Sequence, residues 1–477
     1  MTNHPDAQPH APASDAAPRW SDLLAGPYAA AAWTLCLGVG THALNWFLVA
    51  TAVPSIVLDL GGAAQVSWVS ALYLVFSIVG SAAGGDLKKR LGGRTALAAA
   101  AVVLVAASIL AAAAPSFGVF LIARSVQGLA EGLILALCYV LVAEVFPARA
   151  QPQVFSLLAV VWAVATIAGP IVAGVLTAAA SWRVALWTLV PLAAGLVVLA
   201  VKVVPGGRDE AARPAGFPVL RLSLLLAGAL AICVAGETAI ALLGGGLIVT
   251  SVVLFVAGLA LDRRAAHPLL PRGLLAPRDA SPIGLWIIGL MMFAETGIAV
   301  FCAFIAQIGF STSPLVAGQI ASIPALTWSA AALAIARLSD HLADRAVLAG
   351  PLTISIGLAI VAAGVATMAM APFLIGLALA GAGFGLSHGF LSQRIMAAAA
   401  HGETETTSGG IATFEGIGSA FGAAVAGVVA VRAGFDGSAA SVPSLAIVFA
   451  GGTAVGLVAV ALAVRFVALN RHARRAA

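Results

Sequence analysis

Long apolar segments dominate this sequence and set the class of structure that it can form. Runs of 18 or more predominantly apolar residues recur from near Ala29 to near Val467. A helix needs about 20 such residues to cross a bilayer, and only helices and closed barrels satisfy all of their backbone groups in lipid. The sequence therefore predicts an all-α, polytopic membrane protein surrounded by the lipid bilayer.

The composition excludes other classes of protein. Of 477 residues, 61% are hydrophobic and only 9% are charged, whereas about a quarter of a typical soluble domain is charged. A net charge of +5 would suit a nucleic-acid partner. The basic residues lie between the apolar segments, however, where orientation in a membrane explains them better. No nucleic acid is therefore expected to bind.

The apolar segments predict fourteen membrane spans. Their approximate limits are 29–57, 66–85, 95–114, 117–143, 153–179, 182–203, 219–239, 242–261, 282–308, 314–336, 347–369, 371–394, 407–431 and 442–467. An even number of spans places both termini on one side. With the termini in the cytoplasm, 21 of the 24 Lys and Arg residues are cytoplasmic, as the positive-inside rule requires. We expect a multi-pass protein of the plasma (inner) membrane with both termini cytoplasmic.

The spacing of the spans divides the chain into six, two and six. The expected parts are a disordered cytoplasmic tail (1–28), an N-terminal six-helix half (29–204), a linker with two additional transmembrane helices (205–281), a C-terminal six-helix half (282–468) and a basic cytoplasmic tail (469–477). The first of these is rich in Pro, Ala and Asp and has no apolar core, so we do not expect it to be a cleavable signal peptide.

A short internal repeat supports two related halves. GDLKKRLGGR (Gly85–Arg94) and ARLSDHLADR (Ala336–Arg345) lie 251 residues apart and share the pattern small-x-Leu-x-x-x-Leu-small-x-Arg. Each follows the second span of a six-span half. Such a repeat indicates two like halves around a central cavity that opens on alternate sides.

Charged side chains inside one span point to a polar interior. Arg124, Gln127 and Glu131 are offset by three and seven residues and so share one face of a helix. Each charge costs roughly 2.5 to 3.5 kcal/mol at the centre of a bilayer, so these side chains should face protein or a watery cavity. Arg124 and Glu131 are separated by a rise of about 10.5 Å, and we expect each to have a partner on another helix. A structural network and a functional site both fit this pattern.

Four motifs now resemble a known family. GDLKKRLGGR is similar to the signature loop of the major facilitator superfamily, RSVQG (Arg124–Gly128) to its fourth-helix Arg motif, AGPIVAG (Ala168–Gly174) to its fifth-helix antiporter motif, and SWRVALWTLVP (Ser181–Pro191) to the start of its sixth helix. From about Trp33 to Phe466 the chain resembles the fourteen-span drug/proton antiporter branch. This resemblance implies two six-helix halves plus two linking helices, no cofactor, and function as a monomer.

The chain departs from that family in three respects, one of which is that Glu131, Glu295 and Glu415 match none of its motifs. Lys89 stands where the signature loop usually has Asp, with Asp86 one turn earlier. The second copy keeps its acid, Asp340, together with Arg345. In the first span, LNWFLVATAVP has Asn45 in place of the branch's Asp, which makes narrower or non-cationic substrates more plausible.

Four residues are candidates for proton coupling. Glu131 is the first choice, with Arg124 tuning it, followed by Glu295 and Glu415. An apolar cavity disfavours the charged form of a carboxyl, which lets it bind and release protons near neutral pH. The alternative for each is a permanent hydrogen-bonded contact between helices.

Aromatic and polar residues at the expected depth of the cavity are candidates for substrate binding. They are Asn45, Trp46, Gln127, Trp162, Phe293, Trp328, His388 and Phe414. A mostly apolar lining with a few polar groups suits lipophilic or amphipathic compounds. Aromatic residues in a membrane protein also pack or form interfacial belts, and a single His also serves as a neutral contact between helices.

Eight residues are candidates for gating. They are Asp86, Lys89, Arg94, Gly169, Pro170, Gly174, Asp340 and Arg345. Charge pairs in the two loops would latch the cytoplasmic end shut, although the positive-inside rule alone also places basic residues there. The Gly-Pro pair bends its helix and the glycines allow close helix contact, which favours a moving interface.

The expected function is a secondary active exporter that exchanges protons for small lipophilic or amphipathic compounds. A dedicated exporter of one metabolite or lipid is the alternative, and a polytopic membrane enzyme is a remote one. The short loops offer no catalytic or nucleotide-binding motif. The four cysteines lie within spans without CxxC spacing, so we expect no metal site.

Overall fold

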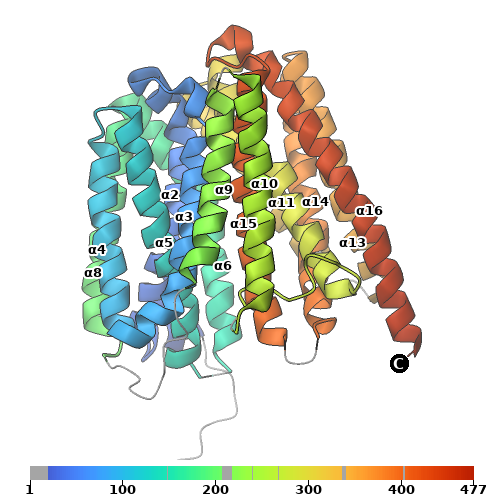
Figure 1. Ribbon diagram of the computed structural model, residues 1–477. Helices are drawn as coiled ribbons and strands as arrows, with labels where there is room; N and C mark the ends of the chain where they lie inside the picture. The colour runs from blue at the N-terminus through green and yellow to red at the C-terminus, as the bar shows by residue number, and fades with distance from the viewer. Residues whose placement is uncertain are drawn as a thin grey trace, which may run out of the picture.

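The computed structural model describes residues 20–147, 149–206, 218–238, 240–266, 268–335, 340–400 and 403–476. These residues form helices joined by short connections, with no strand among them (Figure 1). Fourteen of the described helical segments are long and apolar enough to cross a membrane. The all-helical, fourteen-span fold is therefore confirmed.

The N-terminal half contains six spans. Its elements are α1 (Trp20–Leu24), α2 (Ala29–Leu60), η1 (Ala63–Gln65), α3 (Trp68–Leu91), α4 (Gly93–Ala112), α5 (Phe117–Val145), α6 (Gln151–Ala179), α7 (Trp182–Trp187) and α8 (Leu189–Val203). Local sequence explains the breaks between them. Ser116 and Ser181 cap α5 and α7 with their side chains, and Gly92 takes a φ of 81° in the turn between α3 and α4.

Two linking helices and the C-terminal half complete the bundle. They are α9 (Val219–Glu237), α10 (Ala241–Arg264), α11 (Ala280–Phe304), η2 (Ile305–Gly309), α12 (Pro314–Ile335), α13 (Asp340–Ala366), α14 (Met370–Ala397), α15 (Thr404–Arg432), η3 (Ala439–Leu445) and α16 (Ala446–Ala476). Figure 1 shows α9 and α10 between the two halves. Helix α9 contacts both α3 and α15, so the linking pair covers the seam between these helices.

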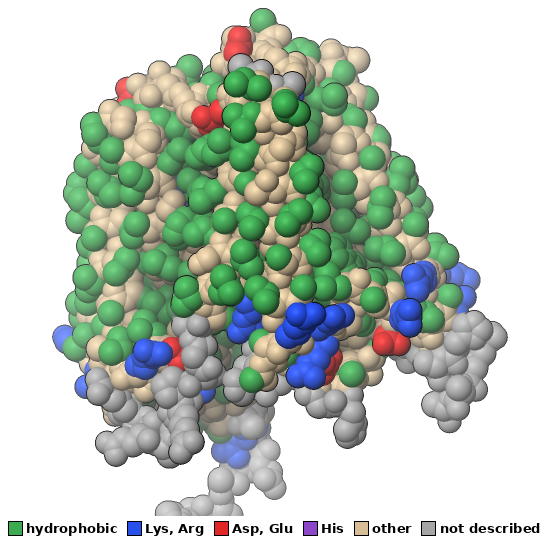
Figure 2. Space-filling view, in the orientation of Figure 1, with side chains coloured by type: hydrophobic (Ala, Val, Ile, Leu, Met, Phe, Trp, Pro, Cys, Tyr) green, Lys and Arg blue, Asp and Glu red, His purple; other side chains and the backbone are tan. Residues whose placement is uncertain are grey.

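The two ends of the bundle differ in charge. Lys and Arg side chains gather at the lower end in Figure 2, below a broad apolar belt. We call this the basic end. It holds the last turns of α3, α8 and α10, which carry Lys88, Lys202 and Arg264. The opposite end holds the connections α2–α3, α4–α5, α6–α7 and α15–α16.

The buried apolar core shows where the halves meet. At the basic end of the N-terminal half, a separate cluster contains Leu35, Leu97, Leu137 and Leu196. At the opposite end, residues of the N-terminal half such as Ile56 join the cluster that fills the C-terminal half. The halves are thus continuous through their core at the opposite end and separate at the basic end.

The ends of the chain correct two details of the sequence analysis. The expected disordered tail (1–28) includes α1, where Leu23 is buried and the Leu24 carbonyl accepts a hydrogen bond from Trp33 Nε1 at 3.1 Å. Residues 1–19 lie outside the described part. The expected basic tail (469–477) continues α16 as far as Ala476.

Candidate functional site

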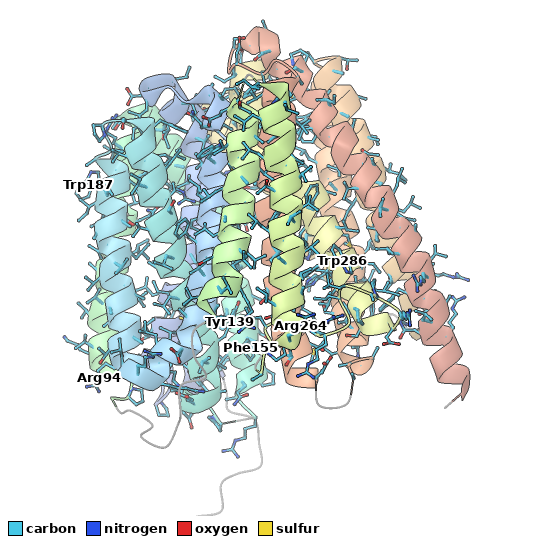
Figure 3. All side chains as sticks on the ribbon, viewed as in Figure 1. Arg94, Tyr139, Phe155, Trp187, Arg264 and Trp286 are labelled. Atoms are coloured by element: carbon cyan, nitrogen blue, oxygen red, sulfur yellow. The ribbon has the colours of Figure 1, made fainter. Side chains whose placement is uncertain are left out.

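A cavity of about 1680 Å³ lies between the halves. Residues of both halves and of the linking helices line it, and the lining extends to the basic end at Tyr139, Phe155, Arg221 and Arg272. Figure 3 shows Tyr139 and Phe155 near that end; they come from α5 and α6, and their ring centroids are 6.1 Å apart. The cavity is therefore accessible from the basic end.

Close contacts between helices shut the opposite end. Gln307 Nε2 donates to the Thr51 carbonyl at 2.9 Å, which joins the end of α11 and η2 to α2. Ser322 Oγ on α12 donates to the Thr166 carbonyl on α6 at 2.7 Å. These contacts join the N-terminal and C-terminal halves, so the cavity ends inside the bundle.

The Gly-Pro motif of α6 lies at this closed interface. A Cβ on Gly174 would come within 2.4 Å of the Leu315 Cα of α12, and a Cβ on Gly169 within 2.8 Å of the Phe47 Cβ of α2. Pro170 itself lies against Gly318. The small residues let α6 approach both neighbours closely.

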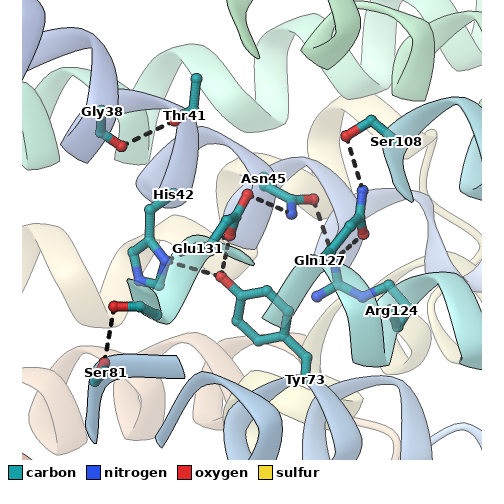
Figure 4. Close-up of polar contacts among 11 residues, drawn as sticks. Gly38, Thr41, His42, Asn45, Tyr73, Ser81, Ser108, Arg124, Gln127 and Glu131 are labelled. Atoms are coloured by element: carbon teal, nitrogen blue, oxygen red, sulfur yellow. Dashed lines mark hydrogen bonds and ion pairs between the residues drawn. The ribbon is translucent and has the colours of Figure 1, made fainter. Parts of the chain in front are cut away.

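A buried polar cluster lies between α2, α3 and α5 (Figure 4). Arg124, Gln127 and Glu131 face the bundle interior from α5. Arg124 NH1 donates to Gln127 Oε1 at 2.8 Å and to Asn45 Oδ1 at 3.1 Å. The Asn45 amide in turn donates to Glu131 Oε1 at 2.8 Å. Both charged side chains have a partner on α2, as their spacing predicts.

Two further members of the cluster were missed by the sequence analysis. The Tyr73 hydroxyl donates to Glu131 Oε2 and lies 2.9 Å from His42 Nδ1. His42 Nδ1 is also 3.3 Å from Glu131 Oε2. The Arg124 guanidinium stacks 4.2 Å above the centre of the Tyr73 ring. A signal did exist, because His42 precedes Asn45 by three residues on the same helix, and a Tyr hydroxyl inside an apolar span requires a partner.

The C-terminal half presents a second acid–histidine pair. His388 Nε2 lies 2.6 Å from Glu415 Oε1, and both residues line the cavity. The His388 ring stacks on Phe384 with centroids 5.2 Å apart. Glu295 also lines the cavity, and none of the described hydrogen bonds or ion pairs involves its side chain.

The structure separates the expected substrate-binding residues into two groups. Trp46, Trp162, Trp328 and His388 line the cavity. The four others do not line it in this conformation. Asn45 and Gln127 are held within the polar cluster. Phe414 packs in the core against Trp286, with ring centroids 5.0 Å apart, and the cavity face of α11 carries Met292, Glu295 and Thr296 rather than Phe293.

The signature loops form contacts within each half. Asp86 pairs with Arg90 at 2.8 Å rather than with Arg94, whose Nε donates to the Val204 carbonyl at 2.8 Å. Lys89 is exposed, while its neighbour Lys88 pairs with Glu144 of α5.

In the second copy, Arg345 is exposed. The side chain of Asp340 lies outside the described part of the chain. Asp344 instead pairs with Arg394 and, at 3.0 Å, with Arg471.

Comparisons with known proteins agree with this architecture. The profile of the Major Facilitator Superfamily matches residues 35–423. A "Probable multidrug-efflux transporter" of Mycobacterium tuberculosis is 30% identical over 454 residues, which cover 92% of this chain and 95% of that protein. "Multidrug resistance protein 3" of Bacillus subtilis is 25% identical over 160 residues, or 34% of this chain and 31% of that protein.

Solved structures share the fold at low identity. The POT family transporter PepTSo superposes with a TM-score of 0.67 at 15% identity, covering 96% of this chain and 99% of its own. The nucleoside transporter NupG gives a TM-score of 0.61 at 15% identity, with 92% and 98% covered. The family profile and the full-length relative describe membrane transporters rather than enzymes. The chain belongs to the Major Facilitator Superfamily.

Proposed function

We propose that this transporter exports small lipophilic or amphipathic compounds in exchange for protons, by alternating access, with its basic end in the cytoplasm of a plasma (inner) membrane. The observation that carries the proposal is a large cavity, accessible from the basic end, beside a fully buried glutamate. The name of the Mycobacterium tuberculosis relative supports export of several compounds.

The lining of the cavity suits lipophilic substrates. Trp46, Trp162 and Trp328 supply apolar surface, and Glu295 and Glu415 supply carboxyl groups. Pockets that combine a mostly apolar lining with a few polar groups bind apolar ligands and orient them through those groups. The volume leaves room for a drug-sized compound.

The proton-binding group in this proposal is Glu131. Its carboxylate is stabilised by Asn45 and Tyr73, and Arg124 is linked to it through the Asn45 amide. Protonation removes the charge that these donors stabilise, which alters the contacts between α2, α3 and α5. A proton at this site can therefore shift the balance between conformations that differ in the packing of these helices.

The test is transport in proteoliposomes with an imposed pH gradient. The panel contains ethidium and rhodamine 6G as lipophilic cations and Nile red as a neutral dye. We expect gradient-driven accumulation of at least one dye by the wild type and its loss in Glu131→Gln. Glu237→Gln is the matched control, because Glu237 is exposed at the far end of α9. Accumulation by Glu131→Gln equal to that of the control would remove Glu131 from the proton path.

A dedicated exporter of one metabolite or lipid is the second candidate. Asn45 replaces the acid that the resembled branch has in its first helix, and its amide is engaged within the cluster rather than in the cavity. At the position of Asn45, α2 therefore offers no carboxylate to a cationic substrate. Failure of every dye on the panel, with the protein folded and correctly inserted, favours this second candidate.

A further inference from the structure

We propose that His42, acting through the Tyr73 hydroxyl, carries protons between the cavity and Glu131. This inference rests on the proposed proton exchange and names the path by which the buried acid gains and loses its proton. It follows from which members of the polar cluster line the cavity and from the hydrogen bonds between them, which Figure 4 draws as dashed lines.

Glu131 has no direct contact with the cavity. Its side chain is 0% exposed, and it is absent from the cavity lining together with Asn45, Arg124 and Gln127. Of the cluster, only His42 and Tyr73 line the cavity. Tyr73 is fully buried, whereas the His42 side chain is 12% exposed. In this conformation, the route from the cavity to Glu131 therefore passes through His42.

The hydrogen bonds give this route a direction. A carboxylate only accepts, so the single hydroxyl proton of Tyr73 is donated to Glu131 Oε2. The Tyr73 oxygen is then free to accept from His42 Nδ1 at 2.9 Å. This assigns the proton of neutral His42 to Nδ1 and leaves the lone pair on Nε2. Among the described residues, no group forms a hydrogen bond with Nε2.

The transfer moves one proton from the cavity to Glu131 and leaves the number of protons on the other groups unchanged. A proton binds His42 Nε2, the Nδ1 proton passes to the Tyr73 oxygen, and the Tyr73 hydroxyl proton passes to Glu131. Glu131 gains one proton, Tyr73 is unchanged, and His42 is again neutral with its proton on Nε2. The reverse sequence returns the proton to the cavity. A histidine is suited to this role because its imidazole can accept a proton at one ring nitrogen while it donates from the other.

The surroundings of His42 contain no competing acid among the described side chains that contact it. Helix α3 contributes Tyr73, α5 contributes Glu131, with Arg124 beyond the Tyr73 ring, and α6 contributes only the uncharged Trp162, whose ring lies 5.5 Å away. The second acid–histidine pair, His388–Glu415, lies on α14 and α15 of the other half.

The experiment uses proteoliposomes of the full-length protein with pyranine inside. An ethidium gradient drives proton flux, and ethidium exchange at equal pH measures substrate translocation alone. We expect His42→Ala to slow proton flux by more than about tenfold, as loss of a proton-transferring side chain does, and to slow ethidium exchange by a much smaller factor. Added imidazole should restore the flux. Tyr73→Phe keeps the ring under Arg124 and should also slow the flux.

Thr41→Val is the matched control, because Thr41 is the neighbouring residue on α2 and, among the described hydrogen bonds, its hydroxyl donates to the Gly38 carbonyl of the same helix alone. If the wild type carries protons and His42→Ala and Tyr73→Phe show the same proton flux as Thr41→Val, the relay alone is overturned. Loss of both flux and exchange in His42→Ala, without rescue by imidazole, assigns His42 a structural role and also overturns it. Ethidium exchange without proton flux in the wild type overturns the proposed function itself, and the relay with it.

Discussion

The side-chain amide of Asn45 donates to the carboxylate of Glu131 across 2.8 Å, while its oxygen accepts from Arg124 across 3.1 Å. An amide can donate and accept at once, whereas an ionised carboxylate only accepts. Asn45 therefore connects two charged groups that are too far apart on α5 to pair directly. One of the residues at which this chain departs from the branch it resembles is thus part of the polar cluster around Glu131.

Loss of this amide should destabilise the protein. Asn45→Leu removes the donor to Glu131 and one acceptor from the buried Arg124, and each unsatisfied buried group costs about 1 to 3 kcal/mol. We expect a lower thermal unfolding temperature in detergent than for Thr41→Val, a buried substitution on the same helix. An unchanged unfolding temperature would show that the link contributes nothing to stability.

Closure of the opposite end should depend on Gly174. Its missing side chain lets α6 lie against Leu315, where a Cβ would come within 2.4 Å of the backbone. We expect Gly174→Leu to separate α6 from α12 at this end. Spin labels at Val175 and Val316, which are 46% and 47% exposed, report the distance by double electron–electron resonance.

Gly451→Leu is the control for Gly174→Leu, since Gly451 lies on α16 with no atom near its Cβ position. The control should leave the distance between the labels unchanged. If Gly174→Leu and the control give the same distribution of distances between the labels, the Gly-Pro motif does not seal this end.

The linking helices should hold part of the rim of the cavity. Asp262 of α10 pairs with Arg221 of α9 and accepts from the backbone N–H groups of Leu269 and Leu270 at 3.0 and 2.9 Å. Breaking a buried pair of this kind costs about 3 to 5 kcal/mol. We expect Asp262→Ala to free the segment that follows α10 and to speed tryptic cleavage after Arg272.

Asp436→Ala is the control for Asp262→Ala, because Asp436 lies in a connection at the opposite end of the bundle. Cleavage after Arg272 at the wild-type rate in Asp262→Ala would show that Asp262 does not anchor this segment. In that case the linking helices act only as a cover for the seam between α3 and α15.

Glu295 should distinguish cationic from neutral substrates. It lines the cavity, and none of the described hydrogen bonds or ion pairs occupies its side chain. We expect Glu295→Gln to weaken ethidium binding about tenfold, equivalent to about 1.4 kcal/mol, and to leave Nile red binding unchanged. Tryptophan quenching of the purified protein measures both. Equal weakening of both dyes would indicate a change of cavity shape instead of a lost charge.

Hydropathy and charge were sufficient to predict the fold. The number of spans follows from the length of the apolar runs, and the inward orientation of Arg124 and Glu131 follows from the cost of charge in lipid. These properties belong to single helices. They can be read from a sequence without knowing which helices are neighbours.

The detailed site depends on contacts between helices, which the sequence does not contain in any local pattern. Tyr73 and His42 reach Glu131 from two different helices, so the polar signal in each helix did not identify Glu131 as its partner. Phe414 neighbours Glu415 in sequence, but the cavity face of α15 carries Thr406, Thr413 and Ser419, and Phe414 is buried in the core. The pairing of His388 with Glu415 likewise joins two helices.

The most direct test of the account is proton release on substrate binding. Purified protein in weakly buffered detergent solution receives ethidium, or whichever dye the panel identifies, and a pH indicator records the change. The account predicts that the wild type and Glu237→Gln release protons as the dye binds, and that Glu131→Gln binds the dye without release. Proton release by Glu131→Gln equal to that of the wild type would contradict the assignment of Glu131 as the coupling acid.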